Sequence, residues 1–165
     1  MGRPDISKIY SSAKKIPCGF MLLESDGESL TASGFITEAE ADAAREAPDG
    51  IIALASRELD AYFAGSLREF SVPLGPEGTP FMLRVWAELR KVPYGRTASY
   101  KDVAIACGNS RVVRAVGLAN NRNPLPIFIP CHRIIGSDGR LSGYGGGTEI
   151  KKFLLDLESG AAGRA

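Results

Sequence analysis

SYKDVAIACGNSRVVRAVGLAN, residues 99–120, is the stretch that decides the fold of the second half of the chain. Ser99 can cap a first helix, because Asp102 follows in capping-box register and Gly108 suits the position just beyond a helix end. After a turn of three residues, a second helix is predicted over residues 111–120. Two helices joined by a short turn that contains glycine are typical of a helix-turn-helix.

The second predicted helix has two faces of different chemistry. At 3.6 residues per turn, Val112, Val113 and Val116 face the core. The opposite face carries Arg111, Arg114, Ala115 and Leu118. A helix that recognises base edges in the major groove usually presents amides or longer polar groups. Small residues with a long cation favour approach to the minor groove, although many helix pairs bind no nucleic acid.

The next segment, NPLPIFIPCHRIIG at residues 123–136, combines a buried-strand pattern with reactive side chains. Its apolar run predicts a strand, yet Cys131, His132 and Arg133 stand consecutively within it, and His132 is the only histidine of the chain. Neighbouring side chains of a regular strand point to opposite faces, so a contact between Cys131 and His132 requires a bend. The three prolines of the segment predict such an irregular path.

A thiol beside an imidazole and a guanidinium is a candidate nucleophile, because such neighbours lower the pKa of the thiol. The alternative is that Cys131 is an inert buried thiol unrelated to His132, which is the expectation for Cys18 and Cys107. Three cysteines without CxxC spacing and a single histidine argue against a disulfide framework and against a zinc site. We therefore expect no metal and no cofactor.

A segment rich in proline and glycine, SVPLGPEGTP at residues 71–80, divides the sequence into two modules. We expect one domain at residues 1–75 and another at 76–165. Residues 1–78 carry 7 Lys and Arg against 13 Asp and Glu, whereas residues 79–165 carry 13 against 6. The basic second half favours a polyanionic partner, although a solvated basic face without a partner is an alternative.

Secondary structure is also predicted outside the helix pair. Residues 81–93 are expected to form a helix, and residues 19–35 a β-hairpin around the turn Asp26-Gly27. Helical spacing continues over residues 49–65, and residues 37–47 fit either a short exposed helix or a loop.

Membrane association is not expected. No apolar run approaches the roughly 20 residues that cross a bilayer, and the first residues lack the apolar core of a signal peptide. With 44% hydrophobic and 24% charged residues, the composition is that of a soluble globular protein, expected in the cytoplasm.

Several motifs, in order along the chain, resemble the O6-alkylguanine-DNA alkyltransferases, the methylated-DNA–protein-cysteine methyltransferases that repair alkylated guanine directly. The C-terminal motifs are IPCHRIIG, SDGRLSGYGGG and KKFLLDLE. Around the helix pair they are PLGPEGTPFMLRVWAELRKVPYGRTASYKDVA and VRAVGLANNRNPLPI. GFMLLESDGESLTASGF and LDAYFAGSLREFSVPL match the family's N-terminal domain more loosely. The resemblance covers nearly the whole chain.

The resemblance implies an α/β (α+β) fold. A small N-terminal α/β domain of the ribonuclease H type would hold an antiparallel sheet. The C-terminal domain would be mostly helical, winged helix-turn-helix-like and DNA-binding. The implied partner is double-stranded DNA that contains O6-alkylguanine, and also O4-alkylthymine, bound by a monomer that clusters on DNA.

The resemblance also implies catalytic roles. Cys131 would accept the alkyl group, and His132 would connect it through a water to Glu158. Tyr100 would rotate the target nucleotide and donate a proton to the leaving base. Asn123 would brace the backbone around the site.

Two further sets of residues follow from the resemblance. The implied DNA contacts are Arg114, which fills the gap left by the extruded base, with Tyr100, Arg111, Ala115, Gly117 and Ser99. The implied substrate pocket comprises Tyr144, Gly145, Pro126, Ile134 and Met82. Gly145 stands where some relatives carry serine, and Met82 where the family more often has glutamine, so the size of the accepted alkyl group is open.

The implied reaction is irreversible and stoichiometric, because nothing in the sequence suggests a means of cleaving a thioether at Cys131. Three other functions are weighed against it. A lesion sensor would bind without transfer, but such proteins lack the acceptor cysteine. A thiol hydrolase would turn over repeatedly, and it usually recruits a histidine from far along the chain. A transcription factor would bind a specific sequence without changing the mass of any cysteine.

Overall fold

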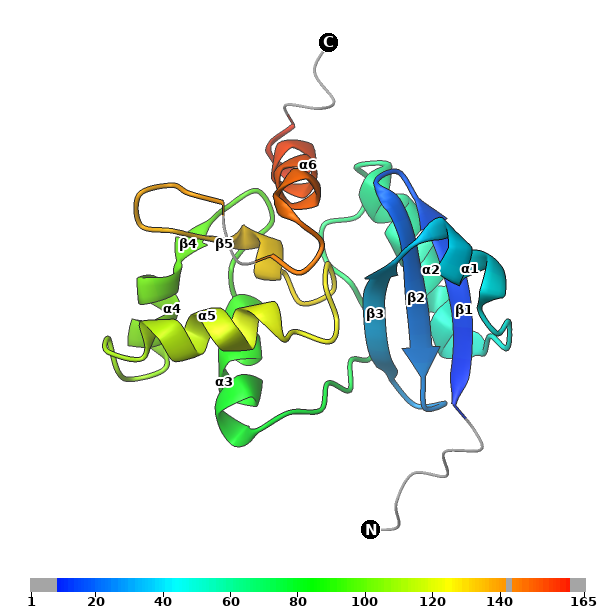
Figure 1. The fold of residues 1–165 in the computed structure, drawn as a ribbon, viewed down its shortest axis with the longest axis horizontal. Coiled ribbons are helices and arrows are strands. Elements are labelled where there is room, and N and C mark those ends of the chain that lie inside the picture. The colour runs from blue at the N-terminus through cyan, green and yellow to red at the C-terminus, as the bar shows by residue number, and fades with distance from the viewer. Residues whose placement is uncertain (1–8, 142–143, 161–165) are drawn as a thin grey trace. The chain divides into compact units, whose positions relative to one another are not determined.

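The computed structural model describes residues 9–141 and 144–160 (Figure 1). The chain divides into two compact units, Met1–Pro76 and Glu77–Ala165. The expected α/β fold, with a small antiparallel sheet in the first unit and a mostly helical second unit, is confirmed.

The first unit is built on an antiparallel sheet with the strand order β1-β2-β3. The strands are β1 (Tyr10–Ile16), β2 (Gly19–Ser25) and β3 (Leu30–Ile36). The pairing of β2 with β3 confirms the predicted hairpin. Its turn is closed by Asp26, whose Oδ1 accepts hydrogen bonds from the backbone N–H groups of Glu28 and Ser29 at 2.9 and 2.8 Å. The polar sequence of β1 gave no comparable signal.

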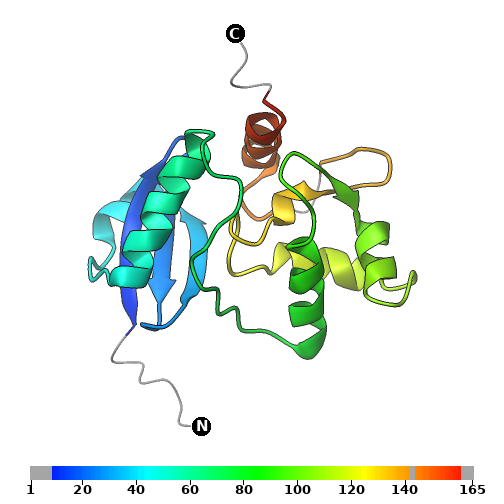
Figure 2. The same ribbon diagram turned by 180° about the vertical axis from the view of Figure 1, so that it is seen from behind.

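Two helices complete this unit. Helix α1 (Glu38–Ala43) begins with a capping box between Thr37 and Glu40, so the exposed-helix alternative for this segment is confirmed. Helix α2 (Gly50–Phe63) is capped by Asp49 and lies across the sheet (Figure 2). The core between α2 and the sheet contains Met21, Leu23, Leu30, Ile52, Ala55, Leu59 and Tyr62.

The second unit consists of short elements connected by long loops. They are α3 (Pro80–Leu89), β4 (Ala98–Ser99), α4 (Tyr100–Ala106), α5 (Val113–Asn121), the 3-10 turn η2 (Cys131–Arg133), β5 (Ile134–Ile135) and α6 (Thr148–Ser159). Strands β4 and β5 pair in parallel, with Ala98 opposite Ile134 and Ser99 opposite Ile135. This pairing places the start of α4 beside the segment that follows Cys131.

Helix α3 fixes the positions of α4 and α5. The Nε1–H of Trp86 donates to the carbonyl of Ala119 on α5 at 2.8 Å. A guanidinium N–H of Arg84 donates to the carbonyl of Cys107, at the end of α4, at 2.6 Å. Because both donors lie on α3, the helix pair is held on a common support.

The first helix of the pair, α4, has the ends that the sequence predicts, whereas the second helix, α5, begins later than predicted. The capping box of Ser99 and Asp102 is confirmed, and Gly108 has the positive φ of 94° that favours glycine after a helix. The second helix, however, begins at Val113 rather than at Arg111. Arg111 remains in the turn, because its backbone N–H donates to the side chain of Asn109 at 2.9 Å.

The burial of α5 is also shifted from the prediction. Its buried residues are Val116, Ala119 and Asn120, whereas Val112 and Val113 are only half-buried. The opposite face is exposed as predicted, with Arg114, Ala115 and Leu118 open to solvent. The later start of the helix explains the shift, because the turn contains both Arg111 and Val112.

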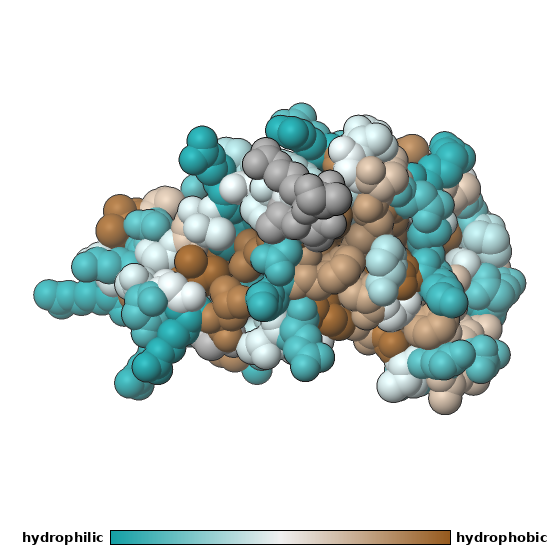
Figure 3. Space-filling model, turned by 90° about the horizontal axis from the view of Figure 1, so that it is seen from above, coloured by the Kyte–Doolittle hydropathy of each residue, from teal (hydrophilic) through white to brown (hydrophobic). Residues whose placement is uncertain are grey.

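The surface of the described part of the chain is mixed in polarity. Figure 3 shows hydrophilic side chains projecting from the face seen from above, with hydrophobic residues between them. No helix among the described residues is long and apolar enough to cross a membrane.

Candidate active site around Cys131

The loop before Cys131 is a chain of tight turns rather than the predicted strand. The side chain of Asn123 accepts from the N–H of Leu125 and donates to the carbonyl of Ile129, both at 2.9 Å. Pro130, with φ −80° and ψ 63°, forms an inverse γ-turn in which Cys131 N–H donates to Ile129 at 2.7 Å. The bend expected from the prolines is therefore present, and the strand is reduced to Ile134–Ile135.

Backbone strain marks the same loop. Ile127 is a β-branched residue with a φ of 75°, a conformation that costs about 1–3 kcal/mol for a non-glycine residue. The turn between Leu125 and Ile129 holds it in place, together with nearly complete burial of the Ile127 side chain. Such strain concentrates at functional sites, where the surrounding structure imposes a special geometry.

The turn η2 directs His132 and Arg133 to a common carboxylate. The Nε2 of His132 lies 2.5 Å from an oxygen of Glu158. Arg133 donates to both oxygens of Glu158, at 2.7 and 3.1 Å, and the N–H of Gly95 reaches the same carboxylate at 3.3 Å. Helix α6 delivers Glu158 from 26 residues beyond His132, with 1% of its side chain exposed.

This arrangement determines the tautomer of His132. A carboxylate that accepts from Arg133 can only accept, so the Nε2 of a neutral imidazole must carry the proton that is donated to Glu158. The lone pair is then on Nδ1. Among the described residues, His132 Nδ1 is a buried atom without a hydrogen-bond partner. The imidazole is therefore oriented as a base with a single available nitrogen.

Burial controls the resting protonation states of the site. It lowers the pKa of His132 below its ordinary value of 6.5, although Glu158 opposes this shift. It raises the pKa of the Cys131 thiol to about 11, although the hydrogen bond of Asn123 and the charge of Lys151 oppose that shift. The expectation that the imidazole and the guanidinium beside Cys131 lower the pKa of its thiol is not met, because burial has the larger effect and raises this pKa.

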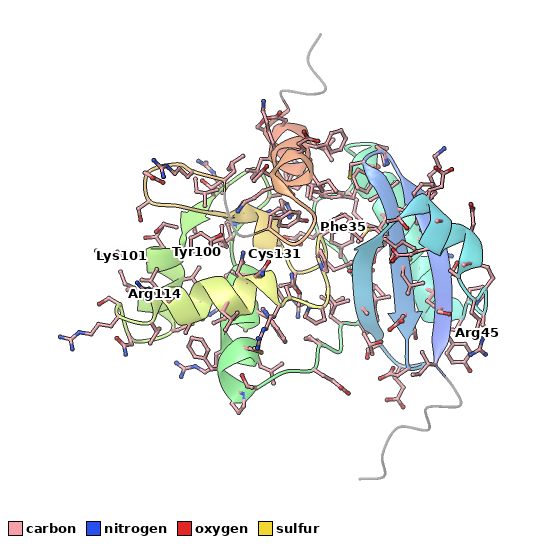
Figure 4. All side chains as sticks on the ribbon, viewed as in Figure 1. Phe35, Arg45, Tyr100, Lys101, Arg114 and Cys131 are labelled. Carbon is pink, nitrogen blue, oxygen red and sulfur yellow. The ribbon has the colours of Figure 1, made fainter. Side chains whose placement is uncertain are left out.

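The other predicted site residues come from several elements of the second unit. Tyr100 is the first residue of α4, and a Cβ added to Gly117 on α5 would lie 4.0 Å from its ring. Ser99 caps the same helix. Figure 4 shows Tyr100 and Cys131 in the second unit, with Arg114 on α5, the second helix of the pair. Tyr100 therefore lies where α4 and α5 approach each other.

The predicted pocket residues come from separate segments. Tyr144 and Ile134 are buried, whereas Pro126 is half-buried in the turn before Cys131. Gly145 is exposed, and a Cβ added there would lie 3.9 Å from the carbonyl of Asn121 at the end of α5. Met82 lies on α3, where its Cβ is close to Gly78.

Lys151 on α6 is a functional candidate that the sequence reasoning missed. Its side chain is fully buried, and its ammonium donates to the carbonyl of Ile134 at 2.5 Å. The spacing of residues along α6 could have indicated this lysine. Positions i, i+3 and i+7 of a helix share one face, and here they are Lys151, Leu154 and Glu158. A charged residue on the apolar face of a helix indicates a specific partner inside the fold.

The described residues contain no group of three or more His, Cys, Asp and Glu side chains that could hold a metal ion. The arrangement around Cys131 suits nucleophilic chemistry. It combines a buried thiol, a neighbouring imidazole with a free lone pair and a carboxylate that orients the imidazole.

Stability is expected to fall as the pH falls below about 6.5, with a slope of up to about 1.4 kcal/mol per pH unit. Because burial lowers the folded-state pKa of His132, the unfolded chain binds a proton in this range that the folded protein does not bind. Urea unfolding between about pH 5.5 and pH 7 measures the slope. His132 is the only histidine, so His132→Gln should remove most of it. An unchanged slope in the variant would show that other groups cause it.

Two family models match the chain and together cover most of it. The model described as "6-O-methylguanine DNA methyltransferase, ribonuclease-like domain" matches residues 9–76. The model described as "6-O-methylguanine DNA methyltransferase, DNA binding domain" matches residues 80–160. The methylated-DNA–protein-cysteine methyltransferase of Methanosarcina acetivorans is 46% identical over 156 residues, which span 91% of this chain and 98% of that protein.

Solved structures agree with these matches. The crystal structure of Mycobacterium tuberculosis O6-methylguanine methyltransferase is similar with a TM-score of 0.82 at 41% identity, and covers 92% of this chain and 93% of that one. The crystal structure of Mycobacterium tuberculosis OGT in complex with DNA has a TM-score of 0.81 at 42% identity, with 91% and 92% covered. Sequence motifs, family models and fold thus agree along nearly the whole chain, which belongs to the family of methylated-DNA–protein-cysteine methyltransferases.

Proposed function

We propose that the protein repairs DNA by moving an alkyl group from O6 of guanine, or from O4 of thymine, to the sulfur of Cys131. The observation that carries this proposal is the buried arrangement of a thiol, an imidazole and a carboxylate, supplied by Cys131, His132 and Glu158. Cys131 is followed directly by His132, and His132 is hydrogen-bonded to Glu158 at 2.5 Å. A relative of known structure, OGT of Mycobacterium tuberculosis, has been crystallised with DNA.

The thiol must lose its proton before it can attack. Burial keeps Cys131 protonated at neutral pH, which protects the thiol from side reactions until substrate is present. We infer that a water between the sulfur and Nδ1 of His132 carries the proton to the imidazole. The resulting imidazolium is stabilised by Glu158, to which its Nε2–H already donates.

The transfer itself is a displacement at the alkyl carbon. The sulfur forms a bond to carbon while the bond from carbon to the base oxygen breaks, and its electron pair remains on the guanine. Tyr100 donates a proton to the departing base, which is general acid catalysis of about 10²–10⁴-fold. The imidazolium then returns a proton to the tyrosine through solvent. Each molecule acts once, since a thioether at Cys131 is stable to these groups.

DNA binding is assigned to the helix pair α4 and α5, acting as a helix-turn-helix at the minor groove. The exposed face of α5 carries Arg114 and Ala115, and Gly117 lies on the same helix near Tyr100, with room for a methyl group between them. The alkylated nucleotide must leave the stack to reach a buried thiol, at a cost of a few kcal/mol. Arg114 offsets part of this cost by occupying the vacated space and neutralising phosphate charge.

The mass of the intact protein after incubation with a duplex that contains O6-methylguanine tests the proposal. We expect one added methyl group per protein, located on Cys131 by peptide mapping, and none in Cys131→Ser. The added mass should saturate at one equivalent, whereas a hydrolase would release product repeatedly. Lesion binding without any added mass would identify a sensor and would refute the transfer.

A further inference from the structure

Lys151 is the buried charge that the relay of Cys131, His132 and Glu158 does not use. It is fully buried, and its ammonium donates to the carbonyl of Ile134, three residues after the thiol. The same nitrogen lies 5.8 Å from the centroid of the Tyr100 ring. Burial of an ammonium is costly unless compensating interactions are present, so this position indicates a specific function.

Helix α6 brings two opposite charges to the site from one face. Glu158 lies two turns after Lys151, and the buried Leu154 lies between them. Glu158 meets His132 and Arg133, whereas Lys151 meets the backbone just after Cys131. The carboxylate therefore contacts side chains of η2, and the ammonium contacts the backbone of the residue that follows η2.

Several charged groups are buried in the site around the thiol. Arg133 and Glu158 form one buried pair of opposite charges. His132 is neutral at rest because burial lowers its pKa. Lys151 adds a cation to this cluster, with its ammonium over the ring of Tyr100 on α4. A thiolate at Cys131 would bring a negative charge into the same cluster as this cation.

We propose that the ammonium of Lys151, held in place by the carbonyl of Ile134, stabilises the negative charge on the Cys131 sulfur during alkyl transfer. The proposal rests on the proposed function of the protein. Lys151 remains protonated throughout, because the thiol proton goes to His132 and the base receives its proton from Tyr100. Burial raises the pKa of the Cys131 thiol and lowers that of Lys151, and the electrostatic attraction between the two groups opposes both shifts, which agrees with this role.

A purely structural lysine would behave differently from a charged partner of the sulfur. If Lys151 served only as a tether for Ile134, its loss would weaken the fold without changing the ionisation of Cys131. Three substitutions separate the two roles. Lys151→Met removes the charge and the donor, Lys151→Gln removes the charge but keeps a donor, and Lys151→Arg keeps the charge.

The test measures how fast iodoacetamide labels Cys131 as a function of pH, without DNA, with peptide mass to quantify the label. An opposite charge near a thiol lowers its pKa by about 1–3 units, so Lys151→Met and Lys151→Gln should shift the pH midpoint upward by about one unit or more. Labelling below the midpoint should then slow by about tenfold or more. Lys151→Arg should keep the midpoint close to that of the original protein. Thermal unfolding identifies folded variants, and Lys151→Gln decides the test if Lys151→Met does not fold.

A midpoint that is the same in the folded neutral variant and in the original protein would overturn the role of Lys151. Methyl transfer from duplex DNA, measured in parallel, keeps this result separate from the proposed function. Normal transfer with an unshifted midpoint refutes only the inference about Lys151. Absence of transfer in the original protein refutes the proposed function, whatever the labelling shows.

Discussion

Glu158→Gln is expected to lower the free energy of unfolding by about 3–5 kcal/mol, because it leaves the guanidinium of Arg133 as a buried charge without its partner. Both carboxylate oxygens of Glu158 accept hydrogen bonds from Arg133, and one of them is also hydrogen-bonded to His132. A glutamine presents an NH₂ group in place of one oxygen, so a donor would face another donor. The loss therefore includes a hydrogen bond as well as the charge pair.

The same substitution should slow methyl transfer by about 10²-fold or more, because the imidazole loses the group that orients it and stabilises its protonated form. Rates should be measured at a temperature where the variant is folded. Urea unfolding measures the stability, and Glu88→Gln is the matched control. Its partner Lys91 is 71% exposed, so the control should change stability by less than about 1 kcal/mol.

The double variant Arg133→Met with Glu158→Gln separates the charge from the packing. Removing both members of a buried pair should be less costly than removing the carboxylate alone, since no unpaired charge remains. Transfer should remain slow in the double variant, because His132 still lacks its partner. If Glu158→Gln alone costs no more than the Glu88→Gln control, the buried pair is not a stabilising element of the site.

Arg114→Ala is expected to slow methyl transfer from duplex DNA by about tenfold to a hundredfold, which corresponds to part of the cost of extruding a nucleotide. Arg114 is exposed on α5, and the proposed chemistry at the sulfur does not involve it. Transfer from the free base O6-methylguanine, which needs no extrusion, should therefore keep its rate. Single-turnover rates at saturating DNA distinguish this effect from weaker binding.

Arg111→Ala is the matched control for Arg114. Arg111 lies in the turn before α5, where it can contribute a phosphate contact but cannot reach into the stack from the helix face. Loss of this side chain should weaken DNA binding at all sequences and reduce the salt dependence of DNA affinity by about the amount expected for one phosphate contact. The rate of methyl transfer at saturating DNA should not change. If Arg114→Ala slows transfer from the free base equally, the proposed role in extrusion is wrong.

The sequence predicted the two ends of α4 correctly, because these ends depend on interactions between neighbouring residues. The capping box of Ser99 and Asp102 and the glycine at position 108 act within a single turn, so their effect does not depend on the rest of the fold. The start of α5 was predicted two residues too early, because Asn109 competes for the backbone of Arg111. Strand β1 was missed, since its pairing with β2 is decided by the sheet rather than by an apolar pattern.

The sequence by itself determined the family, the acceptor candidate Cys131 and the bend before it, because motifs and prolines act through identity and local geometry. Only the tertiary structure decided the electrostatics. Glu158 reaches His132 across 26 residues of sequence, and Lys151 becomes fully buried on the same helix face. Burial also reverses the expected net shift in the pKa of Cys131, because the loss of solvent around a charge depends on packing that brings distant segments together.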